Sequence, residues 1–65
     1  MAKRLLRISP VEGKVGYRKS KIYKMISAGE FPRPVKLGHV SVWPEEEVDA
    51  WIDARIAERG EAADA

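Results

Sequence analysis

The chain has 65 residues and no cysteine, which limits it to one small domain and excludes disulfides and thiolate metal sites. Its formal net charge is +2, and no apolar run approaches the roughly 20 residues that a membrane span needs. We therefore expect a single domain over residues 1–65, in the cytoplasm and away from any membrane. So short a chain has too few residues to line a catalytic cleft, which argues against an enzyme, a cofactor or a small-molecule ligand.

The charges are unevenly distributed along the chain. Residues 1–42 carry ten lysines and arginines against two glutamates, a net charge of +8, whereas residues 43–65 carry eight acidic residues against two arginines, a net charge of −6. This asymmetry favours a basic face for a polyanion and an acidic end that points elsewhere.

The first predicted helix begins at the run Ser9-Pro10-Val11-Glu12. Ser9 is expected to be the N-cap, Pro10 suits the first helical position, and Glu12 completes a capping box. Gly16 is expected to end the helix in the left-handed conformation. An N-terminal arm, residues 1–8, packs against it, and the residues expected to face inward are Leu5, Leu6, Ile8, Val11 and Val15.

A second helix follows Gly16 almost at once. Its apolar residues Ile22, Met25 and Ile26 have the spacing of an amphipathic helix, and Gly29 closes it. The opposite face is polar and basic, with Ser20, Lys21, Lys24 and Ser27. Two short helices joined by a tight glycine-containing turn predict a helix-turn-helix whose second helix has a basic outer face.

A β-hairpin is predicted after this pair of helices. The run Phe31-Pro32-Arg33-Pro34 cannot form regular structure, because two prolines remove backbone donors. Residues 35–37 and 40–43 then alternate as strands do around Gly38-His39, which favours a type II′ or related turn. A lone hairpin is marginal in water, so we expect it to pack on the helices as a wing.

The last predicted helix opens with Glu45, Glu46 and Glu47, which the helix dipole favours in a first turn and for which we expect no basic partner. Its apolar face is formed by Val48, Trp51, Ile52 and Ile56. Trp43 and Trp51 lie within apolar patterns, which favours core packing over stacking on bases. We expect an ordered core over residues 5–57 and a frayed acidic tail over residues 58–65.

The second helix supplies the main candidate binding residues: Arg18, Lys19, Ser20, Lys21, Tyr23 and Lys24. A helix in the major groove needs cations for phosphates and side chains that reach base edges. A merely solvated face normally mixes both charge signs, yet residues 18–28 contain no acid. For Tyr23, a hydrogen bond to phosphate and simple half-buried packing both stay open.

The wing and its flank supply a second set of candidates. Lys36 and His39 either contact DNA from the hairpin or are plain strand and turn residues, while His39 lacks partners for a metal site. Arg33 lies between two prolines and either clamps a phosphate or is simply extended. The cations of the arm either add phosphate contacts or belong to a solvated terminus: Lys3, Arg4 and Arg7.

Several runs resemble the AlpA family of phage and prophage regulators in order and spacing. They are Leu6-Arg7, Ser9-Pro10-Val11, Ile22-Tyr23-Lys24-Met25-Ile26, Gly29-Glu30-Phe31-Pro32, Pro34-Val35-Lys36-Leu37-Gly38, Trp43 and Glu47-Val48-Asp49-Ala50-Trp51-Ile52. The resemblance covers roughly residues 5–55. It implies a mainly α winged helix-turn-helix with a small β-hairpin, related to the MerR-type DNA-binding domain.

The family resemblance also implies a function, the transcriptional regulation of a mobile element, and several similar proteins are excisionases that bend attachment-site DNA for an integrase. The recognition helix of the family usually begins with a capping serine, where this chain has Arg18. That departure weakens the helix start by roughly 1 kcal/mol and leaves the target sequence open.

We therefore expect a sequence-specific protein that binds double-stranded DNA, with an excision factor as the alternative role. A protein-interaction adaptor remains a third hypothesis, with the acidic last helix bound to an integrase or RNA polymerase. Affinity for a partner protein that is unaffected by substitutions at Lys21 and Lys24 would distinguish this hypothesis from DNA binding. A monomer of this size contacts few bases, so we expect cooperative self-association on DNA, although no long heptad seam follows Ile56.

Overall fold

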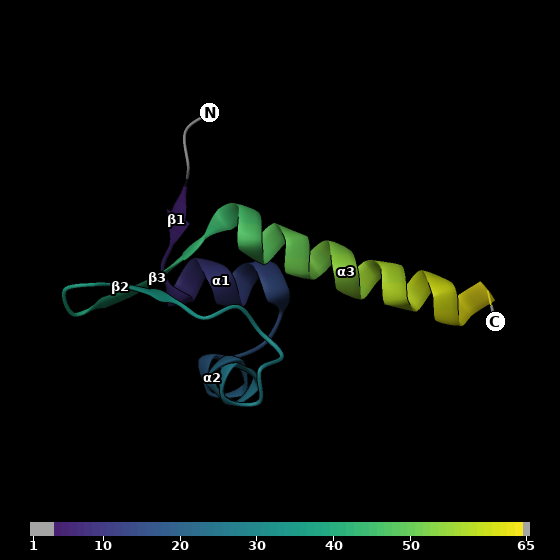
Figure 1. The fold of residues 1–65 in the computed structure, drawn as a ribbon, viewed down its shortest axis with the longest axis horizontal. Coiled ribbons are helices and arrows are strands. Elements are labelled where there is room, and N and C mark those ends of the chain that lie inside the picture. Colours follow the sequence, from purple (N-terminus) through teal and green to yellow (C-terminus); the bar gives the residue numbers. More distant parts are fainter. Residues whose placement is uncertain (1–3, 65) are drawn as a thin grey trace.

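The computed structural model describes residues 4–64 of the chain, and the side chains of residues 4–59. The elements follow in the order β1 (Leu5–Leu6), α1 (Ile8–Val15), α2 (Lys19–Ser27), β2 (Val35–Leu37), β3 (Val40–Pro44) and α3 (Glu45–Asp64). In Figure 1, α1 lies between α3 and α2, and the β2–β3 hairpin projects from the opposite side to the free end of α3. The mainly helical fold with a wing is confirmed, and the short strand β1 is an addition to it.

The first helix begins two residues earlier than predicted. Ile8 is its first residue and Arg7 its N-cap, so Ser9 lies inside the first turn and the predicted capping box is wrong. Pro10 fits there because the first N–H groups of a helix have no partner within the helix in any case. At the other end the prediction is confirmed, since Gly16 has a φ of 82° and its N–H bonds to the Glu12 carbonyl.

The second helix ends in a Schellman motif. The N–H of Gly29 donates to the Ile26 carbonyl at 3.0 Å, and the N–H of Glu30 donates to the Met25 carbonyl at 2.8 Å. Gly29 has a φ of 76°, which an L side chain adopts only with strain. This end fixes the direction in which the chain leaves α2 toward Phe31.

Three antiparallel strands form the sheet, in the order β1-β3-β2. Gly38 has a φ of 64° and His39 does not have a positive φ, the combination of signs expected of a type II′ turn. Leu6 pairs with Trp43 and is buried, so its neighbour Leu5 points to the other face and is 47% exposed. The prediction that Leu5 faces inward is therefore wrong.

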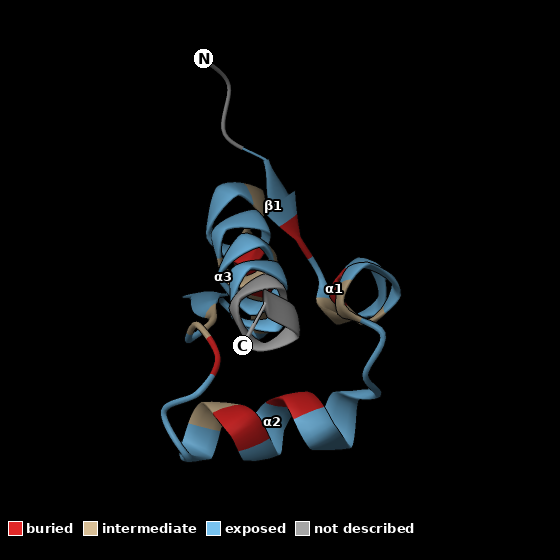
Figure 2. Cartoon of the chain, turned by 90° about the vertical axis from the view of Figure 1, so that its right-hand side faces the viewer, coloured by how far each residue is buried: buried red, intermediate tan, exposed pale blue. Residues whose placement is uncertain are grey.

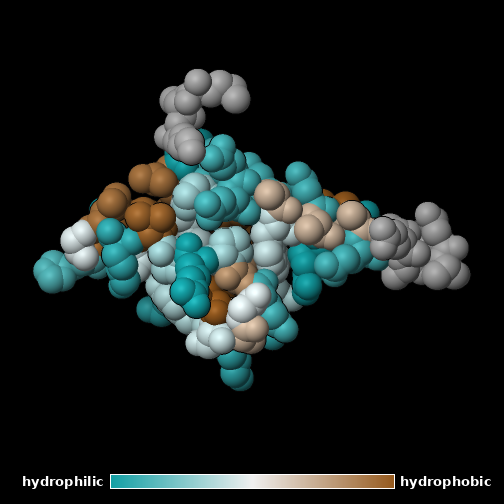
Figure 3. Space-filling model, in the orientation of Figure 1, coloured by the Kyte–Doolittle hydropathy of each residue, from teal (hydrophilic) through white to brown (hydrophobic). Residues whose placement is uncertain are grey.

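The outer face of the sheet is apolar. Leu37 is 52% exposed and Val35 44%, and their partners across the hairpin are Val40 and Val42. Figure 3 shows hydrophobic residues gathered at the end of the molecule from which the β2–β3 hairpin projects. Val42 is buried on this face but lies outside the main core cluster, which contains Trp43 of the inner face.

The core fills the space between the inner sheet face and the helices. Trp43 is fully buried, and its indole N–H donates to the Pro32 carbonyl at 2.9 Å, which confirms its core role. Trp51 is partly buried and packs against the same cluster. The buried members of the cluster are Leu6, Val11, Ile22, Met25, Phe31, Trp43 and Val48.

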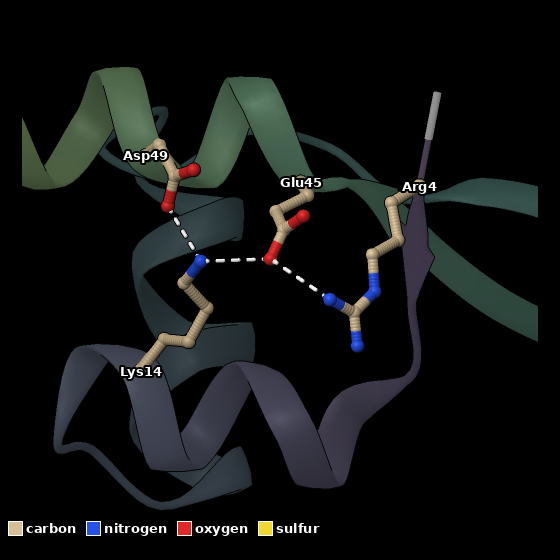
Figure 4. A network of polar contacts seen from close by, with 4 residues as sticks. All are labelled: Arg4, Lys14, Glu45 and Asp49. Atoms are coloured by element: carbon tan, nitrogen blue, oxygen red, sulfur yellow. Dashed lines mark hydrogen bonds and ion pairs between the residues drawn. The ribbon is translucent and has the colours of Figure 1, made fainter. Parts of the chain in front are cut away.

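Ion pairs join the start of α3 to the rest of the fold (Figure 4). Lys14 Nζ lies 3.0 Å from Glu45 Oε2 and 2.6 Å from Asp49 Oδ1, and Arg4 lies 3.9 Å from the same Glu45 oxygen. The prediction that the acids of this turn have no basic partner is therefore wrong for Glu45. Hydrogen bonds from Lys14 to Asp49, and then to Glu45, raise the pKa of the Lys14 ammonium.

The last helix is longer than its apolar pattern. It continues through Gly60 to Asp64, beyond residue 57 where we expected the ordered core to end. Residues such as Ala, Glu and Arg have high helix propensity, so a helix can extend past its last core contact. Across the described residues, 4–64, no helix is long and apolar enough to cross a membrane.

Candidate nucleic-acid interface

The exposed face of α2 gathers the predicted cations. Ile22 and Met25 are buried beneath it, which turns the other side of the helix outward. Figure 2 shows α2 along the lower boundary of the molecule, with no other part of the described chain below it. The predicted residues of this helix and its cap are all exposed: Arg18, Lys19, Ser20, Lys21, Tyr23 and Lys24.

These side chains surround a shallow hollow of about 470 Å³. Four of the predicted residues line it together with Ser27: Ser20, Lys21, Tyr23 and Lys24. The first turn of α2 contains no acidic residue. The face is therefore positively charged and unobstructed, and it can approach a polyanion without like-charge repulsion.

A carboxylate from α1 caps the start of α2. Arg18 is the N-cap residue, as the family resemblance implied, and within residues 4–64 its side chain makes no capping hydrogen bond. Instead, the N–H of Lys19 donates to Glu12 Oε2 at 2.7 Å. The capping serine is thus replaced by a residue of the preceding helix, which also sets how α2 sits against α1.

Sequence reasoning missed this role of Glu12, because the local run Ser9-Pro10-Val11-Glu12 matches a capping box within one helix. The structure places Glu12 one turn before Gly16, on the side from which α2 departs. The only signal in the sequence is the missing cap at Arg18, which leaves α2 in need of an acceptor from elsewhere.

Two tyrosines flank the basic residues of α2. The ring of Tyr23 is 42% exposed and lies 6.3 Å from the ring of Trp43, so it sits at the edge of the core. Tyr17 was not predicted as a site residue. It is 37% exposed in the turn before α2, and Lys21 Nζ lies 5.7 Å from the centre of its ring. This cation–π contact restricts where the Lys21 ammonium can point.

The predicted wing and flank residues lie outside α2: Arg33 in the segment before β2, Lys36 in β2 and His39 in the hairpin turn. Lys36 pairs with Ser41, so it shares the sheet face of Trp43, which is the face nearer to α2. Arg33, Lys36 and His39 are all exposed. The structure therefore brings the α2 residues together on one face and leaves Arg33, Lys36 and His39 apart from that face.

The cations of the N-terminal arm differ in their surroundings. Arg7 is exposed directly before α1, while Arg4 lies within 3.9 Å of Glu45. Lys3 lies outside the described residues. Within the part of the chain that the structure describes, no three His, Cys, Asp or Glu residues are grouped as a metal site would require.

Comparison with known proteins identifies the family of this helix-turn-helix. The family model described as prophage CP4-57 regulatory protein (AlpA) matches residues 4–56. The chain belongs to the AlpA family. The match runs from the residue before β1 into α3, so this AlpA-family chain carries α2 and the wing inside the matched range.

A phage relative supports the same assignment for this AlpA-family chain. The chain is 44% identical over 63 residues to the uncharacterized protein ORF88 of Enterobacteria phage P4, covering 95% of this chain and 72% of the relative. No solved structure matches the chain. The AlpA family is a family of prophage regulatory proteins, which agrees with the resemblance drawn from the sequence.

Proposed function

We propose that this AlpA-family protein binds double-stranded DNA in a sequence-specific way and regulates a mobile element or prophage. The observation that carries the proposal is the acid-free, exposed face of α2 in a helix-turn-helix. A helix is about 10–12 Å wide with its side chains, and the major groove of B-DNA is about 12 Å wide. In this proposal α2 enters the groove, and the protein resides with the nucleoid.

Different residues of the interface have different roles in the proposal. Lys21 and Lys24 contact phosphates, which supply affinity without sequence information. Arg18 and Ser20, at the start of α2, reach base edges, because the N-terminal residues of a recognition helix are those that contact bases. The wing places Arg33, Lys36 and His39 along the neighbouring backbone.

Fluorescence anisotropy with random duplex DNA at several salt concentrations tests the proposal. Each phosphate contact contributes about 0.9 to the slope of log affinity against log salt, so the double variant Lys21→Ala, Lys24→Ala should flatten the slope by about 1.8. The matched control is Arg55→Ala, Arg59→Ala, which removes the same charge from α3. Unchanged affinity in the first variant, or an equal loss in the control, would exclude this docking surface.

The same docking surface would serve an excision factor, so the two regulatory roles need a different measurement. A circular-permutation gel assay reports bending of the bound DNA. Strong bending together with cooperative occupation of adjacent sites would favour an excision factor that works beside an integrase. Binding to a single promoter site without bending would favour a transcriptional regulator.

A further inference from the structure

A second hollow lies on the side of the molecule formed by α3 and the segment that follows α2. Its volume is about 530 Å³, and its lining is separate from the hollow on α2. The residues that matter for its chemistry are Glu30, Phe31, Pro32, Glu47, Ala50 and Trp51. Four of these six are apolar, and the other two are carboxylates.

The apolar wall of this hollow is fixed by specific contacts. The Phe31 and Trp51 rings pack edge to face, with centres 4.9 Å apart and planes at 65°. The indole N–H of Trp51 donates to the Glu30 carbonyl at 2.7 Å. The Schellman motif at Gly29 fixes the segment that carries Glu30 and Phe31. The hollow is therefore formed before any partner arrives.

The two carboxylates of the hollow differ from other acids of the chain. Glu45 and Asp49 hold Lys14, and Glu58 lies 3.6 Å from Arg55. Glu30 and Glu47 are exposed, and among the described side chains, those of residues 4–59, neither has an ion-pair partner. Two uncompensated negative charges thus border an apolar surface.

An internal contact shows which chemistry this wall attracts. The guanidinium carbon of Arg55 lies 5.3 Å from the centre of the Trp51 ring, a cation–π arrangement. Arg55 reaches the ring from within α3, and its carboxylate partner is Glu58 rather than Glu30 or Glu47. The Trp51 ring thus forms a cation–π contact with a guanidinium that does not itself line the hollow, while Glu30 and Glu47 have no ion-pair partner among the described side chains.

We propose that this hollow docks a basic segment of a partner protein, in which arginine or lysine alternates with apolar residues. The cation would bind Glu30 and Glu47, and its apolar neighbours would pack on Pro32, Ala50 and Trp51. Charge complementarity selects this occupant, because two free carboxylates repel the phosphates of a nucleic acid and attract cationic side chains. The proposal does not depend on DNA binding, since it uses none of the α2 cations.

The test is an NMR titration of the ¹⁵N-labelled protein with a blocked arginine–leucine–arginine tripeptide. We expect saturable shifts at the amides of Glu30, Phe31 and Trp51. The variant Glu30→Gln, Glu47→Gln should bind the peptide about five- to tenfold more weakly, since it loses two exposed ion pairs. The matched control is Asp53→Asn, Glu58→Gln, which removes the same charge from α3 and should retain its affinity.

Shifts that fail to saturate, that spread evenly over all the acidic residues, or that weaken equally in the control would overturn the proposal. The substituted side chains are exposed, and the carbonyl that Trp51 binds is part of the backbone, so the fold should survive; circular dichroism checks this. The variant Lys21→Ala, Lys24→Ala should bind the peptide normally, and Glu30→Gln, Glu47→Gln should not bind DNA more weakly. Failure of either proposal is therefore distinguishable from failure of the other.

Discussion

Replacing Glu12 by alanine should destabilise the fold through α2, although Glu12 belongs to α1. Its carboxylate accepts the N–H of Lys19 at 2.7 Å, and Arg18 supplies no alternative cap among the described residues. Loss of an N-cap acceptor costs about 1 kcal/mol, within a range of about 0.5–2 kcal/mol. For a domain of this size, 1 kcal/mol lowers the melting temperature by about 4–8 °C.

Two further variants separate the cap from other effects of Glu12. Glu12→Gln keeps an acceptor oxygen but loses the charge, so it should lose only the interaction with the helix dipole, about 0.3–1 kcal/mol. Arg18→Ser offers a capping hydroxyl at the N-cap itself, so adding it to Glu12→Ala should recover most of the lost stability.

Thermal unfolding followed by circular dichroism measures these differences. Glu58→Ala is the control, because that glutamate is exposed and pairs with Arg55, three residues earlier on the same helix. The control should change stability by less than about 0.5 kcal/mol. A Glu12→Ala protein as stable as the control, or a double variant with no recovery, would show that the carboxylate does not act as a cap.

Three other outcomes are expected. Lys14→Met should lower the melting temperature at neutral pH. Because the pKa of Lys14 is raised in the folded state, this difference should persist up to the pH at which an ordinary lysine loses its proton, and it should vanish at higher pH as folded Lys14 loses its own. Thermal melts over an alkaline pH series measure this dependence. Lys36→Ala should flatten the salt dependence of DNA binding by about 0.9, in the anisotropy assay, if the wing contacts one phosphate. Ile22→Val should cost about 0.5–1.5 kcal/mol in chemical denaturation, since Ile22 is fully buried.

The parts of the fold that could be predicted depend on short-range chemistry. Gly16 and Gly38 were placed correctly because a left-handed φ strongly favours glycine. Ile22 and Met25 were placed in the core because their spacing matches one face of a helix. Each of these features is decided by neighbours in the sequence, so the sequence alone was sufficient.

The features that escaped prediction depend on residues far apart in the chain. Lys14 and Glu45 are separated by 31 residues, and their ion pair exists only because α1 and α3 pack side by side. The strand β1 has two residues, too few to show a period. Glu12 had a plausible local role in a capping box with Ser9, but its carboxylate accepts a hydrogen bond from the N–H of Lys19 at the start of α2.

For the candidate site, exposure was predictable and contact geometry was not. The basic residues of α2 face outward as their spacing indicated, and whether they contact DNA stays a prediction. Tyr17 was overlooked because an isolated aromatic residue in a turn carries no period. Its relation to Lys21 became visible only once the turn and the helix had a defined angle.

The central position of β3 has a consequence for how the chain folds. The β2–β3 pairing joins residues across a two-residue turn, whereas Leu6 and Trp43 are 37 residues apart along the chain. Closing a loop of that length costs roughly 3 kcal/mol of chain entropy before any contact compensates for it. We therefore expect the β2–β3 hairpin to form early. Strand β1 should join the sheet last, after α1 and α2 have packed against it. Because β1 is synthesised before β3, it has no partner strand in this sheet until β3 has left the ribosome.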